Sequence, residues 1–248
     1  MTDRPKTVSL FIPCLVDQIY PQIGIAMAKI LRHLGYQLIY NDKQTCCGQP
    51  AFNAGNRHEA LKVANGFIRL FAESNAPVVS PSGSCTAMIR NYYPVLYEKQ
   101  PQRSQAVALG KKVFEFSEFL EGEDQIKNLK GNFKGKVGFH NSCHSYRELG
   151  IVNAPLRILN QITALEVVQP PGEPVCCGFG GLFSVKFADI GATMARTRIE
   201  MFTSMGIDTI VTNDPGCLMH MRQEAIDQNM DIRFYHLTEF LAEAMDLK

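Results

Sequence analysis

Eight cysteines carry most of the chemistry that this sequence could perform. They form two sets of four in the same order: a single cysteine, an adjacent pair followed by glycine, and a last single cysteine. The first set is Cys14, Cys46, Cys47 and Cys85, and the second is Cys143, Cys176, Cys177 and Cys217. The intervals hold 31 and 37 residues in the first set and 32 and 39 in the second, so the spacing indicates an internal duplication.

The duplication extends beyond the cysteines. The stretch "VSLFIPC" matches "VGFHNSC", and "NAPVVSPSGSC" matches "GIDTIVTNDPGC", each with apolar residues of strand length ahead of a cysteine. Likewise, "FEFSEFL" at 114–120 matches "FYHLTEFL" at 234–241. The copies agree in order and spacing more than in identity, as expected where a backbone arrangement is kept while its packing changes.

Short apolar segments alternate with amphipathic ones along the chain. Strands are expected near 7–13, 36–40, 77–80, 112–116, 136–141, 164–168, 207–212 and 231–235. Helices between such strands cover both faces of a parallel sheet. The pattern therefore predicts an α/β fold of two duplicated Rossmann-like halves, residues 1–130 and 131–248, with the polar segment 121–136 as the candidate linker.

In this topology every cysteine follows a predicted strand and precedes a helix. Such turns meet at the carboxyl edge of a parallel sheet, where ligands bind, so each set of four thiols is expected to converge there. The helix N-termini behind the turns favour thiolate over thiol. Gly48 and Gly178 lack a Cβ and let the backbone approach whatever the sulfurs hold.

Four converging thiolates could hold several groups. Structural zinc usually takes C-x2-4-C pairs, and the sequence contains none. Adjacent cysteines suit a multi-iron cluster better, because neighbouring sulfurs can bind different irons. This reasoning favours an iron–sulfur cluster over zinc. It leaves a dithiol/disulfide protein as a third alternative, since adjacent cysteines form strained and labile disulfides.

The composition argues against other function classes. A net charge of +1 offers no electrostatic attraction to nucleic acid or to an anionic membrane. No apolar run reaches the roughly eighteen residues of a membrane span, and "MTDRPKTVSLFIP" lacks the apolar core of a secretory signal. We therefore expect a cytoplasmic protein, in which clustered cysteines indicate metal or redox chemistry rather than structural disulfides.

The doubled cysteine pattern resembles the cysteine-rich CCG domain family, and "FHNSCHSYRELGI" and "CCGFGGLFSVK" are the stretches most similar to it. The family includes the cysteine-rich subunit of heterodisulfide reductase, the iron–sulfur subunit of glycolate oxidase and the lactate utilization protein A group. The chain length and the two domains resemble the last group most. The resemblance implies an iron–sulfur cluster of the 4Fe-4S type, once or twice per chain, with zinc as the alternative.

The resemblance also implies a function. It is that of an electron-transfer component in a multi-protein system that oxidises L-lactate, a 2-hydroxyacid, to pyruvate. Its partners would be other iron–sulfur and lactate-utilization subunits, and the chain would be an oxidoreductase subunit that is not active alone. The alternatives are a heterodisulfide-reductase-like or dithiol/disulfide redox subunit, and a zinc-stabilised scaffold protein.

The chain departs from the heterodisulfide reductase pattern in the last motif of each half. The cysteine-rich subunit of that enzyme has C-x-x-C there, whereas this sequence has Ser82 in "SGSC" and Asp214 in "DPGC", which leaves four thiols per half. Both residues are predicted to cap the helix that follows. The alternative for Asp214 is an oxygen ligand to one iron.

Three side chains near Cys143 could assist the chemistry. His140 and His144 flank this cysteine in "HNSCH" and could act as ligands, proton shuttles or hydrogen-bond donors to a cluster sulfur, with plain turn packing as the alternative. Arg147 could bind a substrate carboxylate, or form a surface ion pair. No role is assigned to the remaining histidines, His33, His58, His220 and His236.

Overall fold

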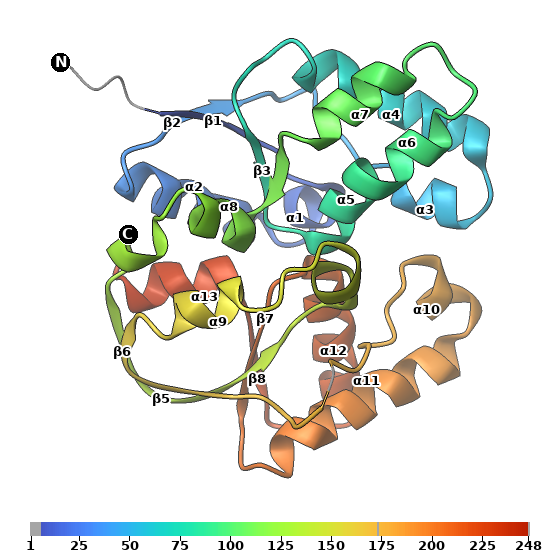
Figure 1. Ribbon diagram of the computed structural model, residues 1–248. Coiled ribbons are helices and arrows are strands. Elements are labelled where there is room, and N and C mark those ends of the chain that lie inside the picture. Colours follow the sequence, from blue (N-terminus) through green and yellow to red (C-terminus); the bar gives the residue numbers. More distant parts are fainter. Residues whose placement is uncertain (1–5, 173, 248) are drawn as a thin grey trace, which may run out of the picture.

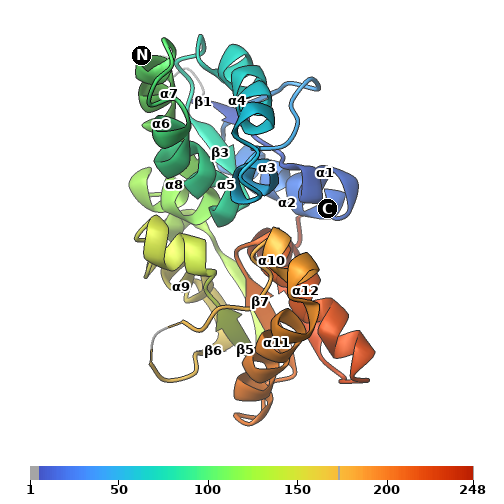
Figure 2. The same ribbon diagram turned by 90° about the vertical axis from the view of Figure 1, so that its right-hand side faces the viewer.

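The computed structural model describes residues 6–172 and 174–247. It contains two four-stranded parallel sheets with the same strand order, β2-β1-β3-β4 and β6-β5-β7-β8. The first half, blue to green in Figure 1, lies above the second half, yellow to red, and Figure 2 shows the same stacking from the side. The two similar halves confirm the predicted α/β fold, while the domain boundary at residue 130 stays a prediction.

The first half alternates strands with helices. Its strands are β1 (Thr7–Leu10), β2 (Gln37–Tyr40), β3 (Val78–Ser80) and β4 (Val113–Glu115). Its helices are α1 (Cys14–Gln18), α2 (Pro21–His33), α3 (Gln49–Asn53), α4 (Arg57–Phe71), α5 (Gly83–Ala87), η1 (Met88–Tyr92), α6 (Tyr93–Leu96), α7 (Arg103–Gly110), α8 (Phe116–Gly122) and η2 (Ile126–Asn128). Helix α2 illustrates the pattern, because it buries Ile23, Met27 and Ile30 on one face.

The second half repeats this order. Its strands are β5 (Gly131–His140), β6 (Ile162–Val168), β7 (Thr209–Thr212) and β8 (Arg233–His236). Its helices are η3 (His144–Glu148), α9 (Ala154–Leu159), α10 (Leu182–Lys186), α11 (Ala188–Thr203), α12 (Pro215–Asp227) and α13 (Leu237–Ala244). The central strands β1 and β5 therefore each pair with the strand that follows and with the next one along the chain.

The prediction of a linker at 121–136 is wrong. Strand β5 begins inside this segment at Gly131, and Ile126 and Leu129 just before it are buried in the core. The segment resembles a linker because the first part of β5 pairs with β6 alone and alternates half-buried with exposed positions. Polar residues and glycine fit such an edge as readily as they fit a loop.

Equivalent helices join the two halves. Helix α2 contacts α13, and α8 contacts α9, between the two sheets (Figure 1). The Thr238 hydroxyl on α13 donates to the Ile23 carbonyl on α2 at 3.0 Å, and Arg157 on α9 pairs with Glu121 on α8 at 2.8 Å. Apolar side chains from both halves form one continuous buried cluster. This shared core holds the carboxyl edges of the two sheets in a fixed relation to each other.

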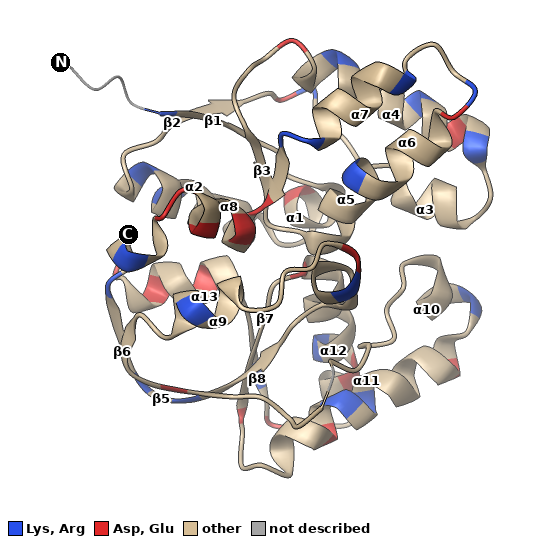
Figure 3. Ribbon diagram, viewed as in Figure 1, with Lys and Arg blue, Asp and Glu red and all other residues tan. Residues whose placement is uncertain are grey.

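The surface carries charges of both signs. Figure 3 shows basic and acidic residues interspersed over the helices of both halves, in keeping with a net charge of +1. Within the part of the chain that the structure describes, no helix combines the length and the apolar character that crossing a membrane requires.

Candidate metal centre

Turns at the carboxyl edge of the first sheet bring four cysteines together. Cys14 is the first residue of α1, Cys46 and Cys47 lie just ahead of α3, and Cys85 lies in α5. Their thiols form a continuous chain of contacts in the order Cys14, Cys46, Cys47, Cys85. The four line a cavity of about 100 Å³, which residues of the second half, Phe179, Gly181 and Pro215, help to enclose.

The second sheet repeats the arrangement. Cys143 immediately precedes η3, Cys176 and Cys177 lie in the loop ahead of α10, and Cys217 is in the first turn of α12. The Sγ atoms of Cys176 and Cys143 are 4.0 Å apart, and those of Cys177 and Cys217 are 3.0 Å apart. The two cysteines of the adjacent pair also contact each other. All eight cysteines are free thiols, and each set predicted from the sequence is brought together.

Glycine is required directly after each cysteine pair. Gly48 and Gly178 have φ values of 87° and 85°, a left-handed conformation that glycine adopts readily. Their N–H groups point back at the first cysteine of the pair, 3.3 Å from Cys46 Sγ and 3.4 Å from Cys176 Sγ. A Cβ on Gly178 would also lie 2.5 Å from the Gly191 carbonyl oxygen. The turn therefore places two sulfurs and an N–H donor within one short segment.

Negative charge concentrates on the first cysteine of each pair. The thiol of Cys14 donates to Cys46 and lowers its pKa to about 3, with further help from Cys47. In the second half Cys143 does the same for Cys176, whose pKa falls to about 2. The pKa values of the donors Cys14 and Cys143 are correspondingly raised. Each set therefore shares protons around one thiolate, and a bound metal replaces those protons.

Asp214 and Ser82 cap helices, as predicted. Ser82 Oγ accepts from the Cys85 N–H at 3.3 Å, and Asp214 Oδ1 accepts from the Gly216 N–H at 2.9 Å. Asp214 also reaches into the first half, where its Oδ2 accepts from the Ser84 N–H at 2.9 Å and from the Ser82 hydroxyl at 3.3 Å. Because N–H and O–H donors occupy both of its oxygens, the geometry favours the cap over a metal ligand. One buried carboxylate thus joins the two helices that carry the last cysteine of each set.

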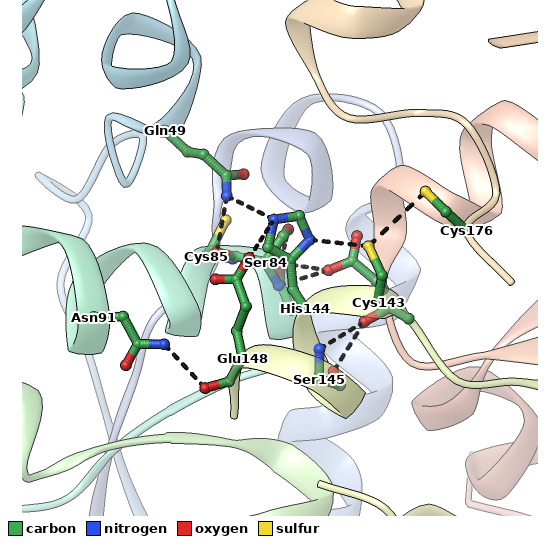
Figure 4. A network of polar contacts seen from close by, with 12 residues as sticks. Gln49, Ser84, Cys85, Asn91, Cys143, His144, Ser145, Glu148 and Cys176 are labelled. Atoms are coloured by element: carbon green, nitrogen blue, oxygen red, sulfur yellow. Dashed lines mark hydrogen bonds and ion pairs between the residues drawn. The ribbon is translucent and has the colours of Figure 1, made fainter. Parts of the chain in front are cut away.

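His144 lies between the two cysteine sets (Figure 4). Its Nδ1 is 3.7 Å from Cys143 Sγ, and its Nε2 is 3.3 Å from the amide nitrogen of Gln49, which lines the first cavity. The same Nε2 lies 3.7 Å from Glu148 Oε1, so this ring nitrogen faces both an amide and a carboxylate. His144 therefore acts as a hydrogen-bonding bridge from the second set to the first cavity.

His140 is fully buried at the end of β5. Arg198 Nε donates to its Nδ1 at 3.0 Å, while its Nε2 has no hydrogen-bond partner among the residues described. A ring nitrogen of His140 and the Sγ atoms of Cys177 and Cys217 all lie within 4.8 Å of one another. Burial, followed by the nearby Arg198 charge, lowers the pKa of His140 to about 3. The imidazole is therefore neutral at physiological pH.

Arg147 lies apart from both cysteine sets, exposed on η3. Its Nη2 donates to the Pro174 carbonyl at 3.3 Å, which ties η3 to the loop that leads to Cys176. This contact supports the loop and points the guanidinium to the surface. Arg147 is not among the residues that line the cavity of the first cysteine set.

Sequence reasoning missed three polar side chains. Arg198 carried no signal beyond a charge within an apolar helix pattern, and Gln49 none at all. His236 was assigned no role, yet it is buried and caps α13 by accepting from the Thr238 N–H at 3.2 Å. The match of "FEFSEFL" with "FYHLTEFL" could have revealed it, because it aligns His236 with Glu115, the cap of α8.

Comparison with known proteins agrees with this geometry. Residues 8–90 and 137–222, which contain the two cysteine sets, match the family model of the cysteine-rich CCG domain. The chain belongs to the CCG cysteine-rich domain family. It is 36% identical to lactate utilization protein A of Halalkalibacterium halodurans over 94% of this chain and 96% of that protein. It is also 36% identical to lactate utilization protein A of Exiguobacterium sp. over 96% of this chain and 98% of that protein.

A solved structure shares the fold. The crystal structure of a hypothetical protein from Helicobacter pylori superposes with a TM-score of 0.64 and 14% sequence identity. The match covers 99% of this chain and 50% of that chain, so this chain spans half the length of that protein. At this identity the likeness supports the two-sheet architecture alone.

Proposed function

We propose that each half of this chain holds an iron–sulfur cluster and that the chain carries electrons in a multi-protein system that oxidises L-lactate to pyruvate. The observation that carries the proposal is the pair of four-thiol sets, each gathered at the carboxyl edge of its own sheet. The relatives named lactate utilization protein A, aligned over nearly the whole chain, support the lactate system as its setting.

The number and type of donors in each set fit such clusters. Each offers four thiols, the usual number of cysteine ligands for one cluster, and the pKa of the first cysteine in each adjacent pair is lowered. Cys47, Cys177 and Cys217 are almost fully shielded from solvent, and apolar neighbours such as Phe179 help to exclude water. When bound, an iron–sulfur cluster accepts and releases an electron. The protein's task is then to hold the sulfurs, limit solvent and place the two centres near each other.

A short path of contacts connects the two sets. From Cys143 it passes through His144 to Gln49 at the first cavity, with the 3.7 Å and 3.3 Å separations given above. Asp214 forms a second link, because it caps the Cys217 helix and the Cys85 helix at once. Two centres in such close relation suit electron transfer through the chain, rather than two independent structural sites.

A zinc-stabilised scaffold is the second candidate, and the sulfur separation of one cysteine pair favours it. A tetrahedral zinc with Zn–S bonds of about 2.3 Å places its sulfurs about 3.8 Å apart. The 4.0 Å between the Sγ atoms of Cys143 and Cys176 is close to that value, whereas the 3.0 Å between those of Cys177 and Cys217 is much shorter. A four-iron cluster needs its sulfurs farther apart, so its binding would open these turns. Metal identity separates the two candidates.

The test of function is reduction of this chain by lactate. Anaerobically purified protein is mixed with the other lactate-utilization subunits and L-lactate, and reduced iron–sulfur centres are followed by EPR. We expect a lactate-dependent signal. Cys47→Ala and Cys177→Ala each remove the signal and the iron of the matching half, whereas the matched control Ser104→Ala, an exposed position on α7, leaves both unchanged.

Two results would contradict the proposal. Iron retained after both cysteine substitutions would show that the adjacent pairs are not ligands. Intact clusters that stay oxidised in the complete lactate-oxidising mixture would remove the electron-transfer role while leaving the metal sites in place.

A further inference from the structure

The second cysteine set has a buried neighbour that the first set lacks. His140 lies beside Cys177 and Cys217, and behind it Arg198 is 3% exposed. The Arg198 guanidinium lies over the Phe202 ring at 4.6 Å, and no carboxylate pairs with it in the described part of the chain. A buried arginine without a carboxylate partner is rare. Burial lowers the pKa of Arg198 to about 10, and the nearby sulfurs of Cys177 and Cys217 oppose this shift.

The hydrogen bond from Arg198 decides the tautomer of His140. A guanidinium has only donors, so the Nδ1 that faces Arg198 Nε at 3.0 Å must offer its lone pair. The single proton of the neutral ring then lies on Nε2. A protonated nitrogen cannot bind a metal, so His140 in this arrangement is a hydrogen-bond donor and not a ligand.

Nε2 needs an acceptor, because a buried N–H without one is unfavourable. The structure gives this atom no partner among the residues described. Cysteine sulfurs within 4.8 Å of the ring, those of Cys177 and Cys217, are the acceptors at hand. We infer that His140 donates its Nε2 proton to a sulfur of the metal centre in the second half, and that Arg198 holds it in the tautomer that can do so. This inference rests on the proposed function.

The first half has apolar packing in place of this histidine and arginine. The alignment of "VSLFIPC" with "VGFHNSC" sets Phe11 opposite His140. Phe11 is fully buried and packs edge-on against Phe67 at 4.8 Å and Phe71 at 6.1 Å. No donor can therefore reach the first set from this position.

The asymmetry gives the two centres different reduction potentials. A hydrogen bond to a cluster sulfur, backed by a buried cation, stabilises the more negative, reduced form. The second centre is therefore the more readily reduced of the two. Electrons that enter at the first centre move to the second, so electron transfer within the chain runs from the first half to the second.

A redox titration of the full chain tests the inference. Anaerobic wild-type protein is titrated potentiometrically and followed by EPR, and the Cys47→Ala protein identifies the signal of the second centre. In His140→Phe, which copies the first half, the second centre becomes about tenfold harder to reduce, a fall of about 59 mV for one electron. The midpoint of the first centre and the iron and sulfide content stay unchanged. Arg198→Met, which leaves the imidazole in place but frees Nδ1, shifts the second midpoint in the same direction.

Each contrary result has a separate meaning. An unshifted second midpoint in both variants, with the clusters intact, overturns the inference and leaves the proposed function standing. Loss of iron from the second half of His140→Phe, with normal folding by circular dichroism, makes His140 a ligand and also overturns it. A wild-type protein that contains no reducible cluster overturns the proposed function, and the inference with it.

Discussion

Asp214 allows the connection between the two cysteine sets to be tested directly. Its carboxylate accepts from the Gly216 N–H in its own helix and from the Ser84 N–H and the Ser82 hydroxyl across the interface. Asp214→Asn removes the charge and turns an NH2 group toward one of these donors. Each lost cap costs about 1 kcal/mol, and hydrogen bonds to a charged group contribute about 1.5–3 kcal/mol. We therefore expect a loss of about 2–4 kcal/mol in the free energy of unfolding.

The assay is anaerobic urea unfolding of the metal-loaded protein, combined with the rate at which a chelator removes metal from each half. Asp208→Asn is the matched control, because Asp208 is exposed and its carboxylate contacts only Arg233 and the Thr209 hydroxyl among the residues described, and its effect should stay within about 0.5 kcal/mol. Ser82→Ala removes the cap of the Cys85 helix and the longer 3.3 Å bond to Asp214, but leaves the bond from the Ser84 N–H in place, and should cost about 1 kcal/mol. In Asp214→Asn, both halves should release metal faster.

Two outcomes would refute this reasoning. An Asp214→Asn protein as stable as Asp208→Asn would show that the carboxylate does not cap both helices. Faster metal release from the second half alone, with an unchanged first half, would show that the bond to Ser84 does not support the Cys85 helix.

Two further predictions concern the glycine turns and a buried cap. Gly178→Ala should destabilise the protein more than Gly48→Ala, although both residues have a positive φ. The new Cβ at position 178 would lie 2.5 Å from the Gly191 oxygen, whereas a Cβ at position 48 would have no neighbour nearer than 3.5 Å. The additional loss in the free energy of unfolding should be about 1–3 kcal/mol in urea, and equal losses would contradict the steric argument. Burial raises the pKa of Glu115 from 4.5 to about 7. Its contribution to stability is therefore complete below pH 4.5 and is lost as the pH rises through about 7, a change of up to about 3 kcal/mol. Glu115→Gln should lack this loss in urea unfolding across that pH range, unlike the exposed control Glu98→Gln, and a pH profile that matches the wild type would rule out the buried titration.

The convergence of the cysteines was predictable from the sequence. Apolar segments of strand length followed by turns lead to parallel strands, and the carboxyl ends of such strands share an edge. Because the spacing is duplicated, the same convergence is expected in both halves. The helix caps at Ser82 and Asp214 are expected from the preference of serine and aspartate for such positions. Local pattern and topology were sufficient for these features.

Contacts between the halves were not predictable in the same way. Asp214 and Ser84 are 130 positions apart, and Gln49 and His144 are 95 apart. Such contacts depend on how α2 and α8 pack against α13 and α9, which no local pattern encodes. The linker prediction failed for a related reason, because the polar first part of β5, which pairs with β6 alone, resembles a loop until the partner strand is known.

The central claim is that each half binds an iron–sulfur cluster, and the metal content of the protein tests it most directly. Iron, zinc and acid-labile sulfide are measured per chain on anaerobically purified protein. The account predicts about eight irons with a matching amount of sulfide, two four-iron clusters per chain. About one or two zinc ions without sulfide, together with failure of anaerobic reconstitution with iron and sulfide, would contradict it.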